Sequence, residues 1–91
     1  MNILITGASR GIGRALALQL AGQQARVGLV ARNVRELSDL QQEITATGQR
    51  AEIYAGNVAD ETFVQQTVDN FVRAFGKVDA LVNNAGMGLF K

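Results

Sequence analysis

Short apolar runs alternate with segments of helical periodicity along the chain, and this alternation restricts the possible folds more than any other feature. Ile3–Thr6 and Val27–Ala31 are apolar runs without polar alternation, which is typical of strands buried on both faces. Residues 51–54 and 79–83 predict a third and a fourth strand. Between these runs, apolar side chains recur every three or four positions, so a helix is predicted after each of the first three strands.

The helix between the second and third predicted strands has signals at both of its ends. Asn33 is a residue type that caps helix N-termini, and Glu36 three positions later completes the pattern of a capping box. Gly48 stands where a C-terminal cap is expected. The stripe predicted to face the core consists of Leu37, Leu40 and Ile44.

The other two helices are predicted from the same kinds of signal. In the first helix, the apolar residues at helical spacing are Ile12, Ala15, Leu16 and Leu20. In the last helix, Asp60 is the predicted N-cap, Glu61 lies near the positive end of the helix dipole, and Gly76 ends the helix. Its predicted inner face consists of Val64, Val68, Phe71, Val72 and Phe75.

Strands and helices in this order predict an α/β fold with a parallel sheet and helices on both faces. Right-handed crossovers favour the strand order 3-2-1-4 of a Rossmann-type sheet, in which the order reverses between the first and fourth strands. Ligands of such sheets bind beyond the carboxyl ends of the strands, at that reversal. Special residues are therefore expected after the first and fourth strands.

The composition excludes several kinds of site. The chain has no cysteine and no histidine, so it cannot assemble a disulfide, a thiolate or imidazole metal site, or a Ser-His-Asp triad. Nine basic and eight acidic residues are scattered without a basic run, which argues against nucleic acid as a partner. No apolar stretch approaches a membrane span and no secretory signal is recognisable, so we expect a cytoplasmic protein without a membrane partner.

A glycine-rich turn follows the first strand. Gly7 permits a tight turn, Gly11 lets backbone amides approach a pyrophosphate, and Gly13 lets the next helix pack close to the strand. The unsatisfied N–H groups of that helix N-terminus favour phosphate, although an ordinary strand-to-helix turn is the alternative interpretation. The predicted phosphate-binding segment comprises Gly7, Ser9, Arg10, Gly11, Ile12 and Gly13.

Two arginines predict which dinucleotide binds. Sites specific for NAD usually place an acid after the second strand, on the ribose 2′-hydroxyl, but this chain has Ala31 and Arg32 there. Arg32 and Arg10 could both bind the 2′-phosphate of NADP through charge-assisted hydrogen bonds, or both could be solvated surface residues. NADP is therefore the predicted cofactor and NAD the second choice. Residues 1–91 are interpreted as a partial dinucleotide-binding domain, truncated after the fourth strand.

A second motif, Asn83-Asn84-Ala85-Gly86, follows the fourth strand. Together with Thr-Gly-x-x-x-Gly-x-Gly at positions 6–13, it resembles the short-chain dehydrogenase/reductase family, and the resemblance runs over the whole chain. In that family the second motif stabilises the central sheet and lines the ribose of the cofactor, which implies that Asn84, Ala85 and Gly86 bind cofactor here. The resemblance also implies hydride transfer between the nicotinamide and a carbonyl or alcohol substrate.

The chain departs from the family's pattern in two places. The family commonly has Asp-Val after the third strand, with the acid near the adenine amino group, whereas this chain has Asn57-Val58. The amide oxygen of Asn57 can still accept that hydrogen bond, so both residues are expected to contact the cofactor. The family's catalytic Ser and Tyr-x-x-x-Lys pair have no counterpart here, because Tyr54, the sole tyrosine, is followed four positions later by valine. No catalytic residue is predicted.

Two functional interpretations follow. The first is the NADP(H)-binding part of an oxidoreductase, inactive as an isolated 91-residue chain, and the alternative is a non-catalytic nucleotide-binding or scaffold module. Leu81 and Val82 of the fourth strand are expected to form an exposed sheet edge, which predicts self-association through that strand.

Overall fold

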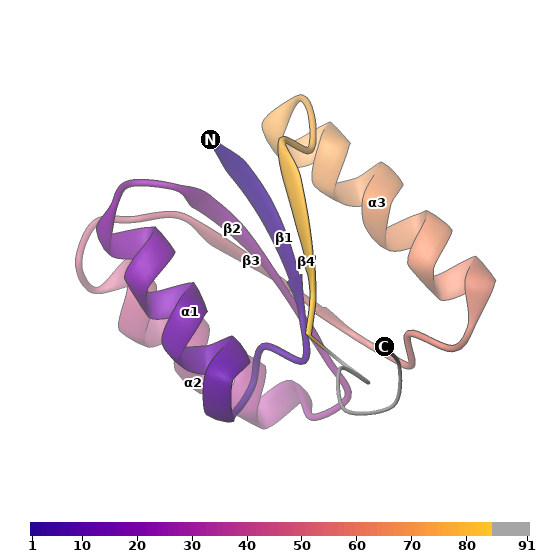
Figure 1. Cartoon of the computed structure of the whole chain (residues 1–91), viewed down its shortest axis with the longest axis horizontal. Helices are drawn as coiled ribbons and strands as arrows, with labels where there is room; N and C mark the ends of the chain where they lie inside the picture. Colours follow the sequence, from indigo (N-terminus) through magenta and orange to yellow (C-terminus); the bar gives the residue numbers. More distant parts are fainter. Residues whose placement is uncertain (85–91) are drawn as a thin grey trace.

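The computed structural model describes residues 1–84, which form four parallel strands and three helices (Figure 1). The strands are β1 (Asn2–Thr6), β2 (Arg26–Ala31), β3 (Ala51–Ala55) and β4 (Ala80–Asn83). The helices are α1 (Gly11–Gly22), α2 (Val34–Thr45) and α3 (Glu61–Phe75). The sheet order is β3-β2-β1-β4 and every neighbouring pair is parallel, which confirms the predicted topology.

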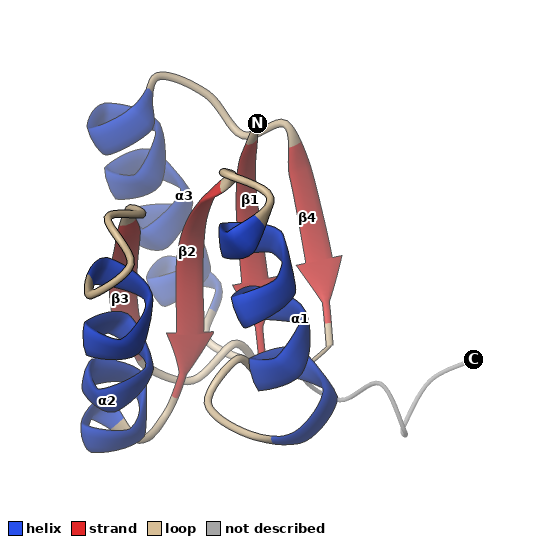
Figure 2. Cartoon of the chain, turned by 90° about the vertical axis from the view of Figure 1, so that its left-hand side faces the viewer, coloured by secondary structure: helices blue, strands red, loops and turns tan. Residues whose placement is uncertain are grey.

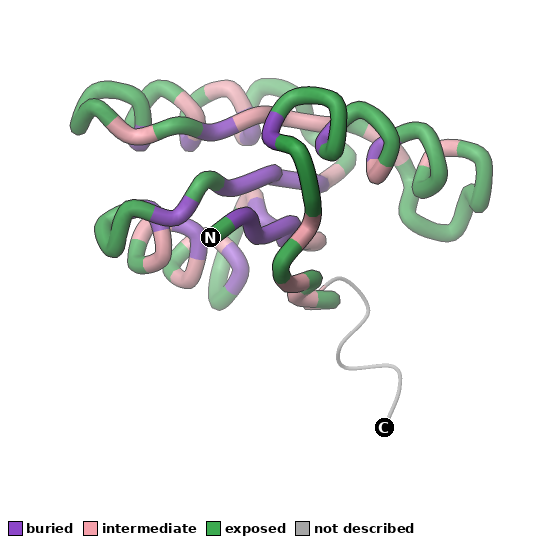
Figure 3. The backbone as a smooth tube through the Cα atoms, turned by 90° about the horizontal axis from the view of Figure 1, so that it is seen from above, coloured by how far each residue is buried: buried purple, intermediate pink, exposed green. Residues whose placement is uncertain are grey.

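Helices cover both faces of the sheet, with α1 and α2 on one face and α3 on the other (Figure 1). The strand side chains alternate between these two layers: Ile3 and Ile5 pack with α1 and α2, whereas Leu4 packs under α3. Buried residues are concentrated in β1, in β2 and on the helix sides that face the sheet (Figure 3). Because both faces are covered, β1 and β2 have the unbroken apolar character that predicted them.

The packing of α3 on the sheet depends on an aromatic pair and one glycine. Phe71 is fully buried and meets Phe75 edge to face, with ring centroids 5.0 Å apart. A Cβ built on Gly28 of β2 would lie 2.5 Å from Leu4 Cδ1 and 2.7 Å from Phe71 Cδ1. Gly28 is therefore required for Phe71 to lie directly against the sheet.

The inner face predicted for α3 was wrong at two positions. Val64 and Val72 are 39% and 38% exposed, whereas Phe71 and Phe75 are buried as predicted. Val64 and the exposed Leu81 of β4 instead line a small cavity of about 260 Å³ between α3 and the sheet. The valines stay exposed because α3 rests on the sheet through its phenylalanines and leaves β4 only partly covered.

Helix α1 buries small residues, although larger apolar residues mark its periodicity. Its buried positions are Gly13, Ala17 and Ala21, whereas Ile12 is 68% exposed. Small side chains on this face allow the helix to lie close to the sheet, and this close approach decides which face is buried. Leu18 and Leu20 pack against the margin of the core cluster.

The helix ends largely follow the prediction. Asn33 and Asp60 cap α2 and α3, and Gly76 ends α3 with a φ of 99°. Helix α2 ends earlier than predicted: its C-cap is Ala46, and Gly48 follows two residues later with a φ of 87°. Within residues 1–84, no helix combines the length and the apolar character needed to cross a bilayer.

Candidate cofactor site

The glycine-rich turn after β1 and the Asn-Asn motif after β4 lie side by side. The strands run in the same direction, so the segments that follow β1 and β4 emerge at one edge of the sheet (Figure 2). Asn84 Nδ2 donates to the carbonyl oxygen of Gly7 at 3.1 Å, and Thr6 Oγ1 donates to Asn83 Oδ1 at 3.0 Å. Side chains thus join two motifs that are more than 70 residues apart, as the strand order predicts.

Gly13 leaves room for the contact between the two motifs because it has no side chain. A Cβ there would lie 2.1 Å from the carbonyl oxygen of Gly7 and 2.7 Å from Asn84 Nδ2. Gly7 and Gly11 have φ values of 63° and 59°, a region that glycine adopts without a steric penalty. No described atom lies within 4 Å of a Cβ built on Gly11, so the turn is open at that point.

The N-terminus of α1 differs from those of α2 and α3. Arg10 occupies its N-cap position without a side-chain cap hydrogen bond, and the first turn, Gly11–Arg14, contains no acid. In α2 and α3, by contrast, the side chains of Asn33 and Asp60 accept hydrogen bonds from first-turn N–H groups. Among the described residues, no side chain caps the positive end of α1, which leaves it suited to an anion.

A large cavity of about 510 Å³ lies beside the turn, where the loops after β1, β2 and β3 come together. Two backbone hydrogen bonds tie the loops after β1 and β3 to the last residues of β2: Ala8 N donates to Val30 O at 3.1 Å, and Gly56 N donates to Ala31 O at 2.9 Å. The predicted site residues that line this large cavity are Gly7, Ser9, Arg10, Arg32, Asn57 and Val58. The lining residues that the sequence analysis missed are Ala31, Asn33, Glu36, Gly56 and Ala59.

The other predicted site residues lie elsewhere. Gly11 and Ile12 are exposed in the first turn of α1, and Gly13 is buried behind them. Asn84 does not line the large cavity, but its side chain donates to the carbonyl oxygen of Gly7, which does. Ala85 and Gly86 lie outside the described residues.

Glu36 is the most informative of the missed residues. Its carboxylate binds Arg10 side-on, with Oε1 3.3 Å from Nε and Oε2 3.3 Å from Nη2. The capping box is therefore only half formed: Asn33 Oδ1 accepts from the Glu36 N–H, but the Glu36 side chain pairs with Arg10. Arg32 lines the same cavity and is exposed, with no ion pair to any residue in 1–84.

The loop after β3 is held by hydrogen bonds of Asn57. Its Oδ1 accepts from the Ala59 N–H at 2.9 Å, and its backbone oxygen accepts from the Asp60 N–H at 2.9 Å. An amide oxygen has two lone pairs, so Asn57 Oδ1 can still accept one hydrogen bond from a ligand. Val58 is 37% exposed and lines both the large and the small cavity.

Tyr54 is a packing residue of β3. Its ring meets Phe71 edge to face, with centroids 6.4 Å apart. Burial, and to a lesser extent the negative charge of Glu52, raises the pKa of Tyr54 to about 12. A tyrosine that donates a proton near neutral pH needs a lowered pKa, so its environment opposes a catalytic role.

Comparison with known proteins gives close relatives over nearly the whole chain. The short chain dehydrogenase family matches residues 1–91. The chain is 42% identical over 87 residues to the 3-oxoacyl-(acyl-carrier-protein) reductase FabG of Staphylococcus aureus, a match that covers 94% of this chain and 35% of that protein. It is 44% identical over 87 residues to the L-rhamnose 1-dehydrogenase (NAD(P)(+)) of Sphingomonas sp., with 94% and 34% covered.

Solved structures give the same result. The L-sorbose reductase from Gluconobacter frateurii, complexed with NADPH and L-sorbose, has a TM-score of 0.89 at 38% identity, covering 94% of this chain and 33% of that one. A metagenomic short-chain oxidoreductase in complex with NADP has a TM-score of 0.83 at 37% identity, covering 89% and 37%. The chain spans about a third of the length of these relatives. The family matches this chain over residues 1–91, and both motifs meet at the carboxyl ends of β1 and β4. The chain therefore belongs to the short chain dehydrogenase family.

Proposed function

We propose that residues 1–91 are the NADP(H)-binding part of an oxidoreductase that acts on a carbonyl or alcohol substrate, with NAD(H) as the second choice of cofactor. The observation that carries this proposal is the meeting of three loops around the large cavity, next to the Asn84–Gly7 hydrogen bond. In parallel sheets of this order, dinucleotides bind across that edge of the sheet.

The turn after β1 fits a pyrophosphate. Its N–H groups and the N-terminus of α1 would bind the phosphate oxygens, and the open space at Gly11 leaves room for them. In this proposal the pyrophosphate-binding residues are Gly7, Ser9, Gly11, Ile12 and Gly13. Asn84, together with Ala85 and Gly86, would line the ribose next to the nicotinamide.

The large cavity fits the adenosine half of the cofactor. Arg10 and Arg32 both line it, and two guanidinium groups supply the charge-assisted hydrogen bonds that a 2′-phosphate needs. Asn57 would accept a hydrogen bond from the adenine amino group, and Val58 would contact the ring. Together with Gly7 and Ser9 at the pyrophosphate, these assignments use every predicted site residue that lines the cavity.

The chemistry proposed for this stretch is limited to cofactor binding. A bound NADP(H) would supply or accept the hydride, while the residues described here would bind and orient the nucleotide. The environment of Tyr54 opposes proton donation, so we propose that an isolated 91-residue chain does not turn over substrate. The carbonyl or alcohol substrate is proposed by analogy with relatives such as the L-sorbose reductase and the L-rhamnose 1-dehydrogenase.

The cofactor proposal is tested by titrating the protein with NADPH and NADH and measuring nucleotide fluorescence. Arg32→Asp should weaken NADPH binding by about ten- to a hundredfold, because the 2′-phosphate loses a charge-assisted hydrogen bond and gains a repulsive charge. NADH should bind as before or more tightly, since the new carboxylate can accept from the 2′-hydroxyl.

Arg35→Asp is the matched control for this experiment. Arg35 is also exposed at the start of α2, but it does not line the large cavity, so its replacement should leave the NADPH to NADH affinity ratio unchanged. A folded protein that binds neither nucleotide would disprove the cofactor proposal. An equal effect of both substitutions would show that Arg32 acts only through general charge.

We also propose that the chain self-associates through β4. This strand is at one edge of the four-stranded sheet, and Leu81 is 58% exposed on it. Leu81→Lys should shift the sedimentation equilibrium toward monomer, because a lysine at an unpaired strand edge opposes pairing with another strand. If the protein without this substitution is monomeric at all concentrations, the proposal is wrong.

A further inference from the structure

The side chain of Glu36 brings a negative charge to a cavity that is otherwise suited to a phosphate. We propose that Glu36 is a specificity-determining residue, which weakens the preference for the 2′-phosphate of NADP by neutralising Arg10. The site would then accept NAD(H) alongside NADP(H). This inference rests on the dinucleotide site proposed above.

The geometry shows how Glu36 engages Arg10. Both carboxylate oxygens lie 3.3 Å from guanidinium nitrogens, one from Nε and one from Nη2, and both residues line the large cavity. The pair thus uses the Nε side of the guanidinium in a two-point contact. A phosphate approaching Arg10 must share the guanidinium with this carboxylate or displace it.

The exposure of the pair sets the strength of this competition. The Arg10 side chain is 78% exposed and that of Glu36 is 34% exposed. Exposed ion pairs are weak, so Glu36 does not immobilise Arg10, and a phosphate can still bind it. The repulsion between the carboxylate and a bound 2′-phosphate nevertheless remains, whereas the uncharged 2′-hydroxyl of NAD(H) does not experience it.

A second ion pair between the same two regions provides a comparison for Arg10–Glu36. Helix α1 and helix α2 are already joined by a second ion pair, Arg14–Glu43, whose residues do not line the large cavity. The N-terminus of α2 is capped by Asn33 without help from the Glu36 side chain. The two pairs therefore differ in position: Arg10 and Glu36 line the large cavity, and Arg14 and Glu43 do not.

The test is Glu36→Gln, which keeps an oxygen that can accept from Arg10 and removes the charge. We expect NADPH to bind about two- to fivefold more tightly and NADH to change by less than about twofold, at low ionic strength. The gain for NADPH should shrink at high salt, because salt screens exposed charges. Glu43→Gln removes the same charge from the other α1–α2 pair and should leave the affinity ratio unchanged.

A double-mutant cycle tests whether Glu36 acts through Arg10. In an Arg10→Ala background, Glu36→Gln should raise the NADPH affinity by less than it does when Arg10 is present, because only the direct repulsion between the carboxylate and the phosphate is then removed. A full gain in that background would contradict neutralisation of Arg10 as the mechanism.

The outcomes separate this inference from the proposal it rests on. If the unchanged protein binds both nucleotides but Glu36→Gln leaves their affinity ratio unaltered, the specificity role is wrong and the cofactor site stands. An equal shift in Glu43→Gln would also overturn the role, because the effect would then be one of net charge. If the folded protein binds neither nucleotide, both proposals fail.

Discussion

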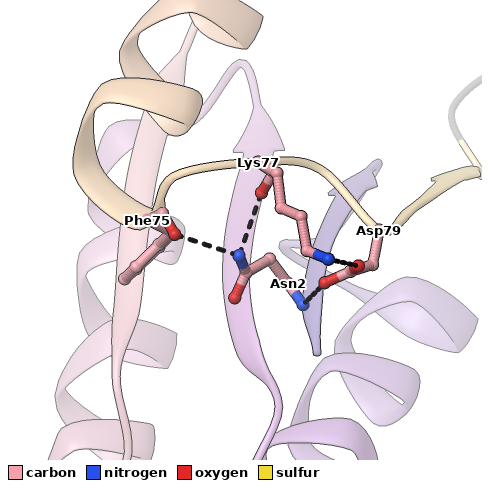
Figure 4. Close-up of polar contacts among 4 residues, drawn as sticks. All are labelled: Asn2, Phe75, Lys77 and Asp79. Carbon is pink, nitrogen blue, oxygen red and sulfur yellow. Dashed lines mark hydrogen bonds and ion pairs between the residues drawn. The ribbon is translucent and has the colours of Figure 1, made fainter.

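The two ends of the sheet, where the strands begin (the amino edge) and where they finish (the carboxyl edge), use their polar groups differently. At the amino edge, the side chain of Asn2 donates hydrogen bonds to carbonyl oxygens at the C-terminal end of α3. At the carboxyl edge, no described side chain caps the N-terminal end of α1. Asn2 Nδ2 donates to the carbonyl oxygens of Phe75 at 3.1 Å and Lys77 at 3.0 Å (Figure 4). The backbone N–H of Asn2 donates to Asp79 Oδ2 at 2.7 Å, and Lys77 Nζ lies 3.3 Å from Asp79 Oδ1. One buried amide thereby fastens the α3–β4 turn to β1.

The carboxyl edge uses its polar groups differently. There the turn contains two glycines with positive φ, and the first turn of α1 has neither an acid nor a side-chain cap. The comparison shows that the amino edge holds the fold together, whereas the carboxyl edge leaves the N–H groups in the first turn of α1 without a described side-chain acceptor. Substitutions at the amino edge should therefore reduce stability, and substitutions in the glycine-rich turn at the carboxyl edge should reduce cofactor affinity.

The largest effect is expected at Gly13, a carboxyl-edge position that also holds the fold together. In Gly13→Ala the new Cβ would lie 2.1 Å from the backbone oxygen of Gly7 and would force the turn away from Asn84. We expect a loss of about 1–3 kcal/mol in the free energy of unfolding, measured by urea denaturation. NADPH affinity should fall by more than about tenfold, since the turn proposed to bind the pyrophosphate is displaced.

Gly22→Ala is the matched control for Gly13→Ala. Gly22 is the last residue of the same helix, and nothing lies within 4 Å of a Cβ built on it. This substitution should be neutral or stabilise the protein by up to about 1 kcal/mol, because alanine has the higher helix propensity. If both substitutions behave alike, the close approach at Gly13 is not the cause.

A slightly smaller effect, confined to stability, is expected from Asn2→Ala. The residue is 6% exposed, and its loss would leave the carbonyl oxygens of Phe75 and Lys77 without their donor. We expect a loss of about 1–2 kcal/mol in the free energy of unfolding and no change in NADPH affinity. Asn70→Ala, on the exposed side of α3, should change stability by less than about 0.5 kcal/mol. A loss of affinity in folded Asn2→Ala would break the proposed division between the two edges.

The smallest effect is expected from Asp79 and depends on pH. The hydrogen bond from the Asn2 N–H lowers the pKa of Asp79 below its ordinary value of 3.8, and Lys77 adds to this. The charged form is thus favoured in the folded state, so its contribution is present above that value and is lost as pH falls through the lowered pKa. Asp79→Asn should make unfolding less dependent on pH below about 4 in acid titrations followed by circular dichroism. An unchanged acid profile would contradict this contribution.

Much of this molecule follows from local pattern. The apolar runs around Ile3 and Val27 predicted the buried strands, and Asn33 and Asp60 predicted two helix starts. These signals are readable because buried strands and helix caps each depend on residues within a few positions of one another. The strand order followed from the handedness of the crossovers. Because this order makes β1 and β4 neighbours, it also predicted that the motifs after these two strands lie together.

The errors lie where the partner of a residue is distant in the sequence. The exposed Val64 could not be recognised, because its exposure depends on how far α3 covers β4. The small buried face of α1 depends on the contact of Gly13 with Gly7, not on apolar periodicity. Glu36 was interpreted as part of a capping box because Asn33 is three positions away, whereas its actual partner, Arg10, is 26 positions away.

The sequence by itself determined the strands, the helix starts, the sheet order and the glycine-rich turn after β1, since each of these depends on periodicity, propensity or chain chirality. Only the tertiary structure decided that Asn84 contacts Gly7, that Asn2 satisfies the end of α3, and that Glu36 pairs with Arg10. These pairs form because parallel strands bring distant segments together at their ends. The orientation of each side chain there depends on neighbours that no local pattern specifies.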